Sequence, residues 1–442
     1  MARRRISHLV SFSAEVLMDR RQLLFGSLAA GLCRPHLLAG MSHWTSEKFP
    51  PVRTITRGPK FHWFGYYDKL QFDPTNRYVL SNQVDFEHRT PTSEDTIRVG
   101  MVDTEAGDKW MELGESRSWG WQQGCMLQWL PNSKSKVIWN DRQNDKFVSH
   151  VLDVKTQDRK TLSSPIYTLA SSGEFGLSAD FARIQIMRPG YGYVGLPDKN
   201  HHDVAPKDSG IFKVDLKTGA SKLILSLADV AKIPYQGQQL RNVKHYFNHL
   251  LVSPDSKRFI ALHRWRKYDA KNDKTIGGFI TRMITANVDG SDVYVLDPSG
   301  HTSHFIWRDP EHVCMWTRPQ GKKAAFYLYK DKTRKVEIVG EGVMPRNGHN
   351  TYLPLKNHAW ILNDTYPDKN RNQNPFLYHV PTNKRFSLGE FHLPPEYKGE
   401  WRCDTHPRSS CDGRTICIDS PHLGNGRQLH LIDVEKILES GN

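Results

Sequence analysis

Apolar and polar residues follow one another in the same order several times along the chain. A short apolar stretch is followed by a turn rich in Pro, Asp, Ser, Asn or Gly, and a second apolar stretch follows the turn. This order predicts a β-hairpin. The clearest copies span residues 247–263, 348–363 and 404–419, and weaker copies span residues 66–83, 124–141, 166–180 and 303–317.

Each hairpin is followed by a further stretch in which apolar and polar residues alternate. Alternation of this kind predicts a half-buried antiparallel strand. The seven stretches span residues 98–103, 148–153, 210–215, 283–289, 325–330, 376–380 and 428–433. The chain is therefore expected to form seven small antiparallel sheets.

Seven small sheets in one register predict an all-β fold, a seven-bladed β-propeller with four-stranded antiparallel blades. A β-sandwich would not keep one register through seven copies, and helical periodicity is nearly absent. Residues 187–244 form a longer piece that contains Gly and Pro. We expect this piece to be an insertion that loops over one face, where propellers place their specificity.

The first 45 residues match no copy of the repeat. Arg20 and Arg21 precede a modestly apolar stretch from Leu23 to Leu32, which is the outline of a twin-arginine export signal. An ordinary basic N-terminus is the alternative. We expect an export signal and linker in residues 1–45, a single β-propeller domain in residues 46–442, and a periplasmic or secreted protein.

The composition predicts a large core and an anionic partner. Of 442 residues, 38% are apolar and 11% aromatic, and the formal net charge is +14. Such a charge suits an acidic glycan, a nucleic acid or a membrane surface, although scattered, solvated charge is the alternative. The chain has no long basic run or RNA-binding motif and no apolar run of the roughly 20 residues that span a bilayer. We expect an anionic polysaccharide or oligosaccharide partner, no nucleic acid, no membrane and a monomer.

Cysteine usage argues against a full disulfide framework. Five cysteines follow the predicted signal, and an odd number leaves room for one bridge among the last three. They are Cys125, Cys314, Cys403, Cys411 and Cys417.

One position of the repeat carries histidine in the last four copies. Counting five residues back from the proline of the turn, or its equivalent, gives Lys69, Met126, Tyr167, His249, His304, His349 and His406. Equivalent positions near the start of an inner strand surround a propeller's central channel, so the four imidazoles are expected to converge. They predict a site for a divalent metal, Zn²⁺, Mn²⁺ or Ca²⁺, to which His263 could add a ligand. The alternative is that each histidine hydrogen-bonds a neighbouring blade.

Tyrosine and arginine residues accompany these histidines. Tyr167 holds the repeat position in the third copy, where a core tyrosine is the alternative. Arg183 is expected just past a strand end and before the Gly-rich segment Arg188–Tyr193, a suitable place to bind a carboxylate. The second strands end in polar pairs that are either turn formers or ligands of sugar hydroxyls and of the histidines. These pairs are Asn82–Gln83, Asn140–Asp141, His263–Arg264 and Asn363–Asp364.

The chemistry that these residues suit is β-elimination at a uronic acid. The chain has no nucleophile elbow, P-loop, dinucleotide fingerprint or zinc-protease helix, and no pair of carboxylates stands out in the repeat register. In β-elimination the carboxylate is neutralised by arginine or a metal, and histidine or tyrosine acts as base and acid.

Four segments resemble motifs of the seven-bladed polysaccharide lyases. They are His62–Lys69, Trp121–Trp129, Asp180–Arg183 and Arg188–Tyr193, within a resemblance that runs from about residue 58 to 434. The ulvan lyases of families 24 and 25 look most similar, and the oligogalacturonate lyases of family 22 are more distant.

The two resemblances imply different site roles. The ulvan lyases imply Tyr167 as acid/base and Arg183 as the group that neutralises the carboxylate, with His62 and His88 as candidates for the upstream histidines. The oligogalacturonate lyases imply His249 as base and His304, His349 and His406 as metal ligands. We assign catalysis to Tyr167, Arg183, His249 and His88, substrate binding to Arg188, Tyr191, Tyr193, His62, Gln123 and Arg264, and metal binding to His249, His263, His304, His349 and His406.

The function expected from the sequence is a polysaccharide lyase that cleaves an ulvan-like or oligogalacturonate-like glycan. The main alternative is a non-catalytic propeller of the TolB type that binds protein or glycan. A metal-dependent hydrolase is a third interpretation.

Overall fold

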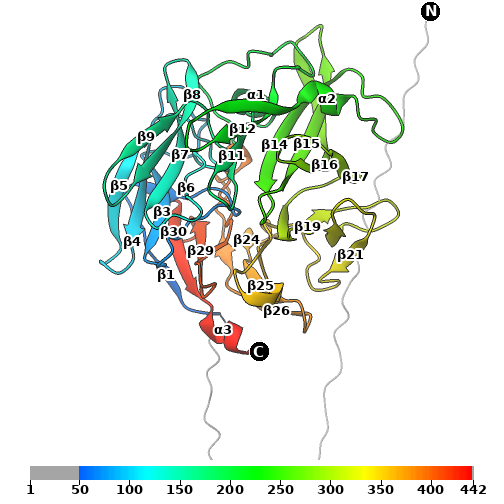
Figure 1. Ribbon diagram of the computed structural model, residues 1–442. Coiled ribbons are helices and arrows are strands. Elements are labelled where there is room, and N and C mark those ends of the chain that lie inside the picture. Colours follow the sequence, from blue (N-terminus) through cyan, green and yellow to red (C-terminus); the bar gives the residue numbers. More distant parts are fainter. Residues whose placement is uncertain (1–48, 441–442) are drawn as a thin grey trace, which may run out of the picture. The chain divides into compact units, whose positions relative to one another are not determined.

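Residues 49–440 are described by a computed structural model, and their regular secondary structure is almost entirely β-strand (Figure 1). They form seven four-stranded antiparallel sheets and one two-stranded sheet. This confirms the all-β class with four-stranded antiparallel sheets that the repeat predicts.

Six sheets follow one another along the chain, each with its strands in sequence order. The first sheet consists of β2 (Phe61–Trp63), β3 (Tyr78–Val84), β4 (Ile97–Asp103) and β5 (Lys109–Ser116). The second consists of β6 (Gln128–Trp129), β7 (Lys136–Gln143), β8 (Lys146–Asp153) and β9 (Arg159–Leu162). The third consists of β10 (Thr168–Leu169), β11 (Phe175–Ser178), β12 (Gly210–Asp215) and β13 (Ser221–Ser226). The fourth sheet consists of β14 (Val243–Val252), β15 (Arg258–Asp269), β16 (Lys274–Asn287) and β17 (Tyr294–Gly300). The fifth consists of β18 (Phe305–Asp309), β19 (His312–Thr317), β20 (Ala325–Lys330) and β21 (Val336–Val339). The sixth consists of β22 (Thr351–Tyr352), β23 (Trp360–Asn363), β25 (Phe376–His379) and β26 (Lys384–Ser387). The two-stranded sheet pairs β24 (Asn372–Gln373) with β27 (Phe391–His392).

The seventh sheet joins the two ends of the described chain. It contains β28 (Arg408–Ser409), β29 (Thr415–Ser420) and β30 (Gln428–Asp433), and its fourth strand is β1 (Val52–Thr54). Val52 pairs with Ile432 and Thr54 with His430, so the blue and red ends of the ribbon lie side by side (Figure 1). The sequence pattern does not predict this fourth strand.

The tight turns of the hairpins explain why the repeat contains Asp and Ser. Asp73 accepts a hydrogen bond from the backbone N of Tyr78 at 2.7 Å, and Ser253 accepts one from Arg258 N at 2.9 Å. Ser410 accepts one from Thr415 N at 3.0 Å. Side chains that bond nearby backbone groups favour turns, so the same five-residue closure recurs in three sheets.

Helices occupy little of the described chain, but the one that directly follows β11 contains Arg183. Arg183, expected just past a strand end, lies in α1 (Phe181–Met187), whose N-cap Asp180 accepts from the backbone N of Arg183. The other helical elements are α2 (Leu227–Ala231), α3 (Glu435–Ser440) and two 3₁₀ turns, Lys356–His358 and Gly399–Trp401. The expected insertion from residue 187 also contains β12, β13 and α2.

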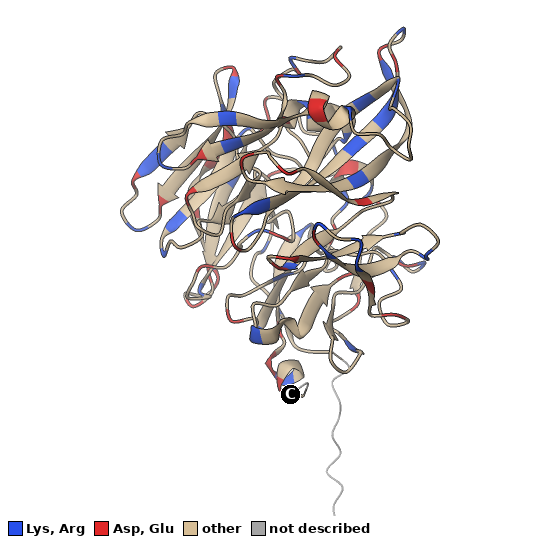
Figure 2. Cartoon of the chain, turned by 45° about the vertical axis from the view of Figure 1, so that its right-hand side comes forward, with Lys and Arg blue, Asp and Glu red and all other residues tan. Residues whose placement is uncertain are grey.

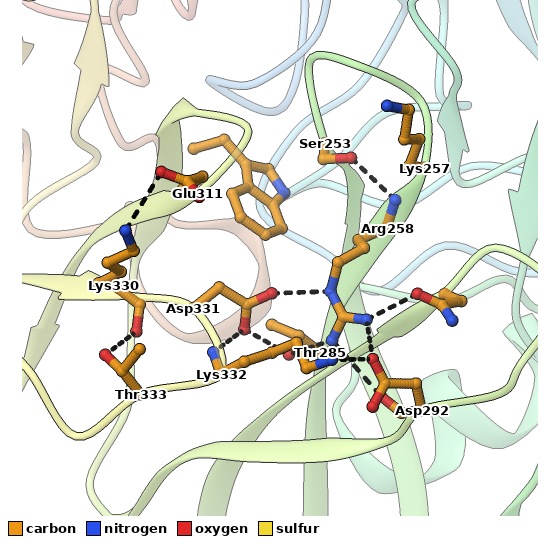
Figure 3. A network of polar contacts seen from close by, with 12 residues as sticks. Ser253, Lys257, Arg258, Thr285, Asp292, Glu311, Lys330, Asp331, Lys332 and Thr333 are labelled. Carbon is orange, nitrogen blue, oxygen red and sulfur yellow. Dashed lines mark hydrogen bonds and ion pairs between the residues drawn. The ribbon is translucent and has the colours of Figure 1, made fainter.

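Arg258, at the start of β15, links two neighbouring sheets (Figure 3). Its Nε donates to Asp331 Oδ2 at 2.7 Å, and its Nη1 donates to Asp292 Oδ2 at 2.9 Å and Asn287 Oδ1 at 2.7 Å. Asp331 follows β20 of the next sheet, and Thr285 of β16 donates to its Oδ1 at 2.7 Å. This buried network therefore stabilises one inter-sheet boundary.

Four further observations bear on the expectations from the sequence. All five cysteines of residues 49–440 are free thiols, so none of the last three forms a bridge. No helix in the described part of the chain is long and apolar enough to cross a membrane. The predicted export signal lies outside the described residues. Lys and Arg are spread over many strands and loops (Figure 2).

Candidate functional site

The repeat position that carries histidine directly precedes the first strand in five of the seven four-stranded sheets of the described chain, whereas Lys69 follows β2. Tyr167 and His304 immediately precede β10 and β18, and Met126, His349 and His406 lie two residues before β6, β22 and β28. His249 lies within β14, where the register shifts between Asn248 and Leu250. Met126, His249 and His406 share a left-handed backbone, with φ of 56°, 51° and 38°. Non-glycine residues adopt this conformation rarely, so its recurrence supports the equivalence of the positions.

Three of the four histidines form one buried cluster. The ring centroids of His304 and His349 are 4.1 Å apart, and those of His349 and His406 are 4.2 Å apart. Burial lowers the pKa of His304 and of His406 well below the usual value. Both rings are therefore neutral at neutral pH, and each has a ring nitrogen with the lone pair that a metal requires.

This cluster has the composition of a metal site. Ligand atoms of His349, Asp404 and His406 lie within 4.8 Å of one another. The buried Nε2 of His406 has no hydrogen-bond partner among the described residues. Imidazole and carboxylate donors suit Zn²⁺ and Mn²⁺, so the residues fit a divalent ion.

Neighbouring side chains orient the rings of the cluster. His349 Nδ1 lies 2.9 Å from Asp364 Oδ1, and Thr405 donates to the other oxygen of the same carboxylate at 2.7 Å. His304 Nδ1 lies 3.0 Å from Asn347 Oδ1. Such contacts leave Nε2 of His349 as the nitrogen that faces a ligand, whereas Nε2 of His304 lies 3.4 Å from the Tyr366 hydroxyl. Asp364 is one of the polar strand ends expected to orient the histidines.

His249 lies beside the cluster but pairs with a carboxylate. Its Nε2 lies 3.1 Å from Asp68 Oδ2, and both side chains are almost fully buried. Burial outweighs the carboxylate and lowers the pKa of His249 to about 4. The neutral ring donates from Nε2 to Asp68, which leaves Nδ1 with a lone pair. His249 is therefore placed to accept a proton rather than grouped with the metal ligands.

His263 does not belong to the cluster. Its Nδ1 accepts from Arg282 Nε at 3.0 Å, and its Nε2 lies 2.8 Å from His245 Nδ1. Because both ring nitrogens have partners, the structure offers no free donor for a metal at this position.

The hydroxyl of Tyr167 is enclosed by hydrogen bonds. It lies 2.8 Å from Gln123 Nε2 and 3.2 Å from Asn248 Oδ1, and it accepts from the backbone N of His249 at 2.9 Å. Burial raises the pKa of Tyr167. Tyr167 and Gln123 are thus brought together, and the Tyr167 hydroxyl holds the bulge that carries His249.

Arg183 fixes a loop instead of facing the histidines. Its guanidinium donates to Asp198 Oδ2 at 2.9 Å and to the backbone oxygens of four residues. These acceptors are Asn200, Asp203, Val204 and His245, at 2.7 to 3.1 Å. With its donors occupied, Arg183 does not correspond to the expected carboxylate ligand.

Arg188 and Arg264 instead present free donors. Phe279 of β16 lies between them, with the guanidinium carbons 4.9 Å and 4.6 Å from its ring centroid. The buried Nη1 atom of each arginine has no partner among the described residues. Burial and the nearby charge of Arg188 lower the pKa of Arg264 to about 10. A bound anion would relieve this repulsion between two cations.

Tyr191 and Tyr66 connect the arginines to the histidines. Arg188 lies over the ring of Tyr191, 4.0 Å from its centroid. Although burial raises the pKa of Tyr191, the positive charges of Arg188 and Arg402 outweigh it and lower that pKa. The ring centroid of Tyr66 lies 6.4 Å from that of Tyr191, 4.8 Å from that of His249 and 5.3 Å from that of His406.

Three expected site residues lie elsewhere. The Tyr193 hydroxyl accepts from Asn140 Nδ2 at 2.8 Å, and its ring stacks on Phe181. His62 Nε2 lies 3.2 Å from Gln83, with its ring against Trp110 at 5.0 Å. His88 is exposed and its ring contacts Tyr397 at 4.6 Å. None of the three has a described contact with the histidine cluster.

Residue-level reasoning missed several members of the site. Tyr66, Tyr67 and Asp68 lie in the segment His62–Lys69, of which the repeat register selects only Lys69. Asp404 precedes His406 by two residues, and this short spacing is the feature of the sequence that indicates Asp404 as a member of the same site. The Tyr67 hydroxyl bonds the backbone of Phe305 at 2.8 Å and 3.0 Å, which links this segment to the fifth sheet.

Comparison with known proteins supports the fold. Oligogalacturonate lyase from Vibrio parahaemolyticus aligns with a TM-score of 0.60 at 14% identity, over 89% of this chain and 96% of that chain. An oligogalacturonate lyase in complex with manganese aligns with a TM-score of 0.62 at 13% identity, over the same shares. TolB from Acinetobacter baumannii aligns with a TM-score of 0.38 at 12% identity, over 71% of this chain and 64% of that chain. No protein-family model and no curated protein matches the chain.

The two oligogalacturonate lyases show a β-propeller fold shared with this chain. The resemblance to that family is thus supported at the level of fold, and the resemblance to the ulvan lyases stays a prediction.

Proposed function

We propose that this protein is a polysaccharide lyase that cleaves a uronate-containing anionic glycan by β-elimination. One observation carries the proposal: two arginines, Arg188 and Arg264, pack on the same ring of Phe279, and each keeps one buried guanidinium nitrogen without a partner among the described residues. Arg264 is also close enough to His249 for its charge to lower the pKa of that histidine. Guanidinium groups recognise carboxylates well. The fold likeness to the oligogalacturonate lyases, one of which is described in complex with manganese, supports the same assignment.

In this proposal Arg188 and Arg264 bind the uronate carboxylate. Their charge stabilises the negative charge that develops when the proton on C5 leaves. His249 accepts that proton at Nδ1, because Asp68 holds its Nε2–H. The electron pair of the broken C–H bond forms the C4–C5 double bond as the C4–O bond breaks.

Tyr191 donates a proton to the departing oxygen. A phenol whose pKa is lowered by nearby cations is a better proton donor than an ordinary tyrosine. His349, His406 and Asp404, with His304 beside them, would hold a divalent metal. When bound, the metal adds positive charge near the substrate carboxylate.

The proposal is tested by incubating the purified protein with oligogalacturonate and with ulvan. Formation of the unsaturated uronate is followed by its ultraviolet absorbance. Arg188→Ala and Arg264→Ala are each expected to reduce kcat/KM by about 100-fold or more, because each removes a charged contact to the developing anion. Exposed Arg334→Ala removes the same charge elsewhere and is expected to retain activity.

Two outcomes would contradict this proposal. Cleavage without the chromophore indicates a hydrolase. Binding of either glycan without any cleavage indicates the non-catalytic propeller. The export route is part of the same proposal and is tested separately, by locating the protein after replacement of Arg20 and Arg21 with lysine.

A further inference from the structure

The loop from Asp198 to Val204 lies at the surface but is held firmly. Arg183 donates to the side chain of Asp198 and to the backbone oxygens of Asn200, Asp203 and Val204. Lys244 Nζ donates to the backbone oxygen of His201. These contacts fix the backbone of two consecutive histidines, His201 and His202, whose side chains are partly or fully exposed.

The tip of the β15–β16 hairpin meets this loop. β15 has 12 residues and β16 has 14, and Asp273 lies in the turn between them. Asp273 Oδ2 lies 2.8 Å from His201 Nε2, and its Oδ1 lies 3.9 Å from His202 Nδ1. Tyr268 donates to the same Oδ1, which fixes the carboxylate.

The three side chains have the spacing of a metal site. One ligand atom from each of His201, His202 and Asp273 lies within 4.8 Å of the others. Zinc binds nitrogen and oxygen ligands at roughly 2.0–2.2 Å in a tetrahedron, which places ligand atoms about 3.4 Å apart. The distances of 2.8 Å and 3.9 Å lie on either side of this value, so small rotations of exposed side chains suffice.

We propose that His201, His202 and Asp273 form a second divalent-metal site, of the kind that binds Zn²⁺, distinct from the buried histidine cluster. A simple hydrogen bond between His201 and Asp273 does not account for His202, whose ring lies 4.9 Å from that of His201. The remaining coordination position is open to water, because Asp273 and His202 are exposed. This inference does not depend on the proposed lyase activity.

A metal at this site would connect the hairpin to the loop. The hairpin also carries Phe279, against which Arg188 and Arg264 pack, and Arg266, whose Nη1 donates to Met187 O at 3.3 Å. Metal binding at the tip therefore restrains the strand that supports the two free arginines.

Zinc binding to the full chain tests the site. Zn²⁺ is titrated by calorimetry into metal-free wild type, His201→Ala/His202→Ala, His406→Ala, His88→Ala and a triple variant that combines His406→Ala with the double substitution, after circular dichroism confirms that each is folded. The double variant is expected to bind about one ion fewer than wild type, and His88→Ala, an exposed histidine outside both clusters, is expected to match wild type. The loss in the double variant is expected to persist in the His406→Ala background, since the two sites are separate. Equal stoichiometry in wild type and the double variant would overturn the proposal.

Limited proteolysis tests the link between hairpin and loop. Lys271 and Lys274 flank Asp273 and are exposed, so trypsin can cleave after them. Zinc is expected to slow this cleavage in wild type and in His406→Ala but not in the double variant, which also controls for any effect of zinc on trypsin. Cleavage that zinc leaves unchanged in wild type would show that the metal does not connect the two segments.

Discussion

The contacts made by one ring nitrogen decide what each histidine of the site can do. His349 is oriented by Asp364, so its Nε2 faces His406 and Asp404 and suits a metal. His249 is oriented by Asp68, its ring packs against Tyr66, and the charge of Arg264 acts on it. The sequence register places both rings at equivalent positions. It does not reveal which carboxylate reaches which ring, because Asp68 and Asp364 come from different sheets.

Replacing Asp68 separates these two roles. Asp68→Asn keeps the shape of the side chain but removes the charge that holds His249 in the tautomer with a free Nδ1. We expect kcat on the glycan substrate to fall by about 100-fold, with little change in KM, because a general base acts only in the chemical step. Steady-state kinetics on the unsaturated product measure this.

Asp364→Asn is the matched control. It disturbs His349 instead of His249, so its main effect is expected on metal affinity, weakened by about 10-fold or more. An unchanged kcat in Asp68→Asn, with the protein folded, would remove His249 from the role of base.

Among the elements, the insertion after β11 departs most from the sequence expectation. The segment Asp180–Arg183 does not show a helical period long enough to be recognised, yet Asp180 caps α1 and Arg183 anchors the loop that follows. An arginine that binds a ligand and one that binds backbone carbonyls have the same sequence signature. Only tertiary contacts distinguish the two arginines: the donors of Arg183 are occupied, whereas Nη1 of Arg188 has no partner among the described residues.

The boundary between the fourth and fifth sheets offers a stability test (Figure 3). Asp331→Ala leaves Arg258, whose side chain is only 13% exposed, without its closest carboxylate. The variant leaves the guanidinium with only the partly exposed Asp292 as a carboxylate partner and removes the acceptor of the Thr285 hydroxyl, so the free energy of unfolding is expected to fall by about 2 kcal/mol. Urea unfolding monitored by tryptophan fluorescence measures this change.

The exposed pair Lys323–Glu341 provides the control for this measurement. Its side chains are 63% and 59% exposed, so Glu341→Ala is expected to change the free energy of unfolding by less than about 1 kcal/mol. If the two variants were equally stable, the inter-sheet network would contribute no more than a surface pair.

At the scale of the whole molecule, the repeat predicts the sheets better than it predicts how they close. Alternating apolar residues indicate seven units, because each strand must bury one face. The last unit contains only three strands after residue 404, and its fourth strand is β1, at the other end of the described chain. Three residues, Val52–Thr54, are too few to show alternation, and their partner β30 lies far along the sequence.

The stability of the molecule is expected to depend on pH through histidines outside both metal-ligand groups. Burial lowers the pKa of His62 and of His430 to about 4 and that of His245 to about 3. In the unfolded chain these groups titrate near 6.5. Below that pH the unfolded state binds more protons than the native state, so stability falls as the pH decreases toward the native pKa values.

Each of these histidines is expected to contribute about 2 kcal/mol to the loss of stability between pH 7 and pH 5. His430→Gln tests one of them, since glutamine can still bond Ser420 O and Thr54 but cannot take up a proton. In His430→Gln the difference between the free energies of unfolding at pH 7 and pH 5 is expected to be about 2 kcal/mol smaller than in wild type. In the control His88→Gln, at an exposed position, this difference is expected to equal that of wild type. Urea titrations on metal-free protein give both quantities, and an undiminished difference in His430→Gln would mean that acid acts on the fold through other groups.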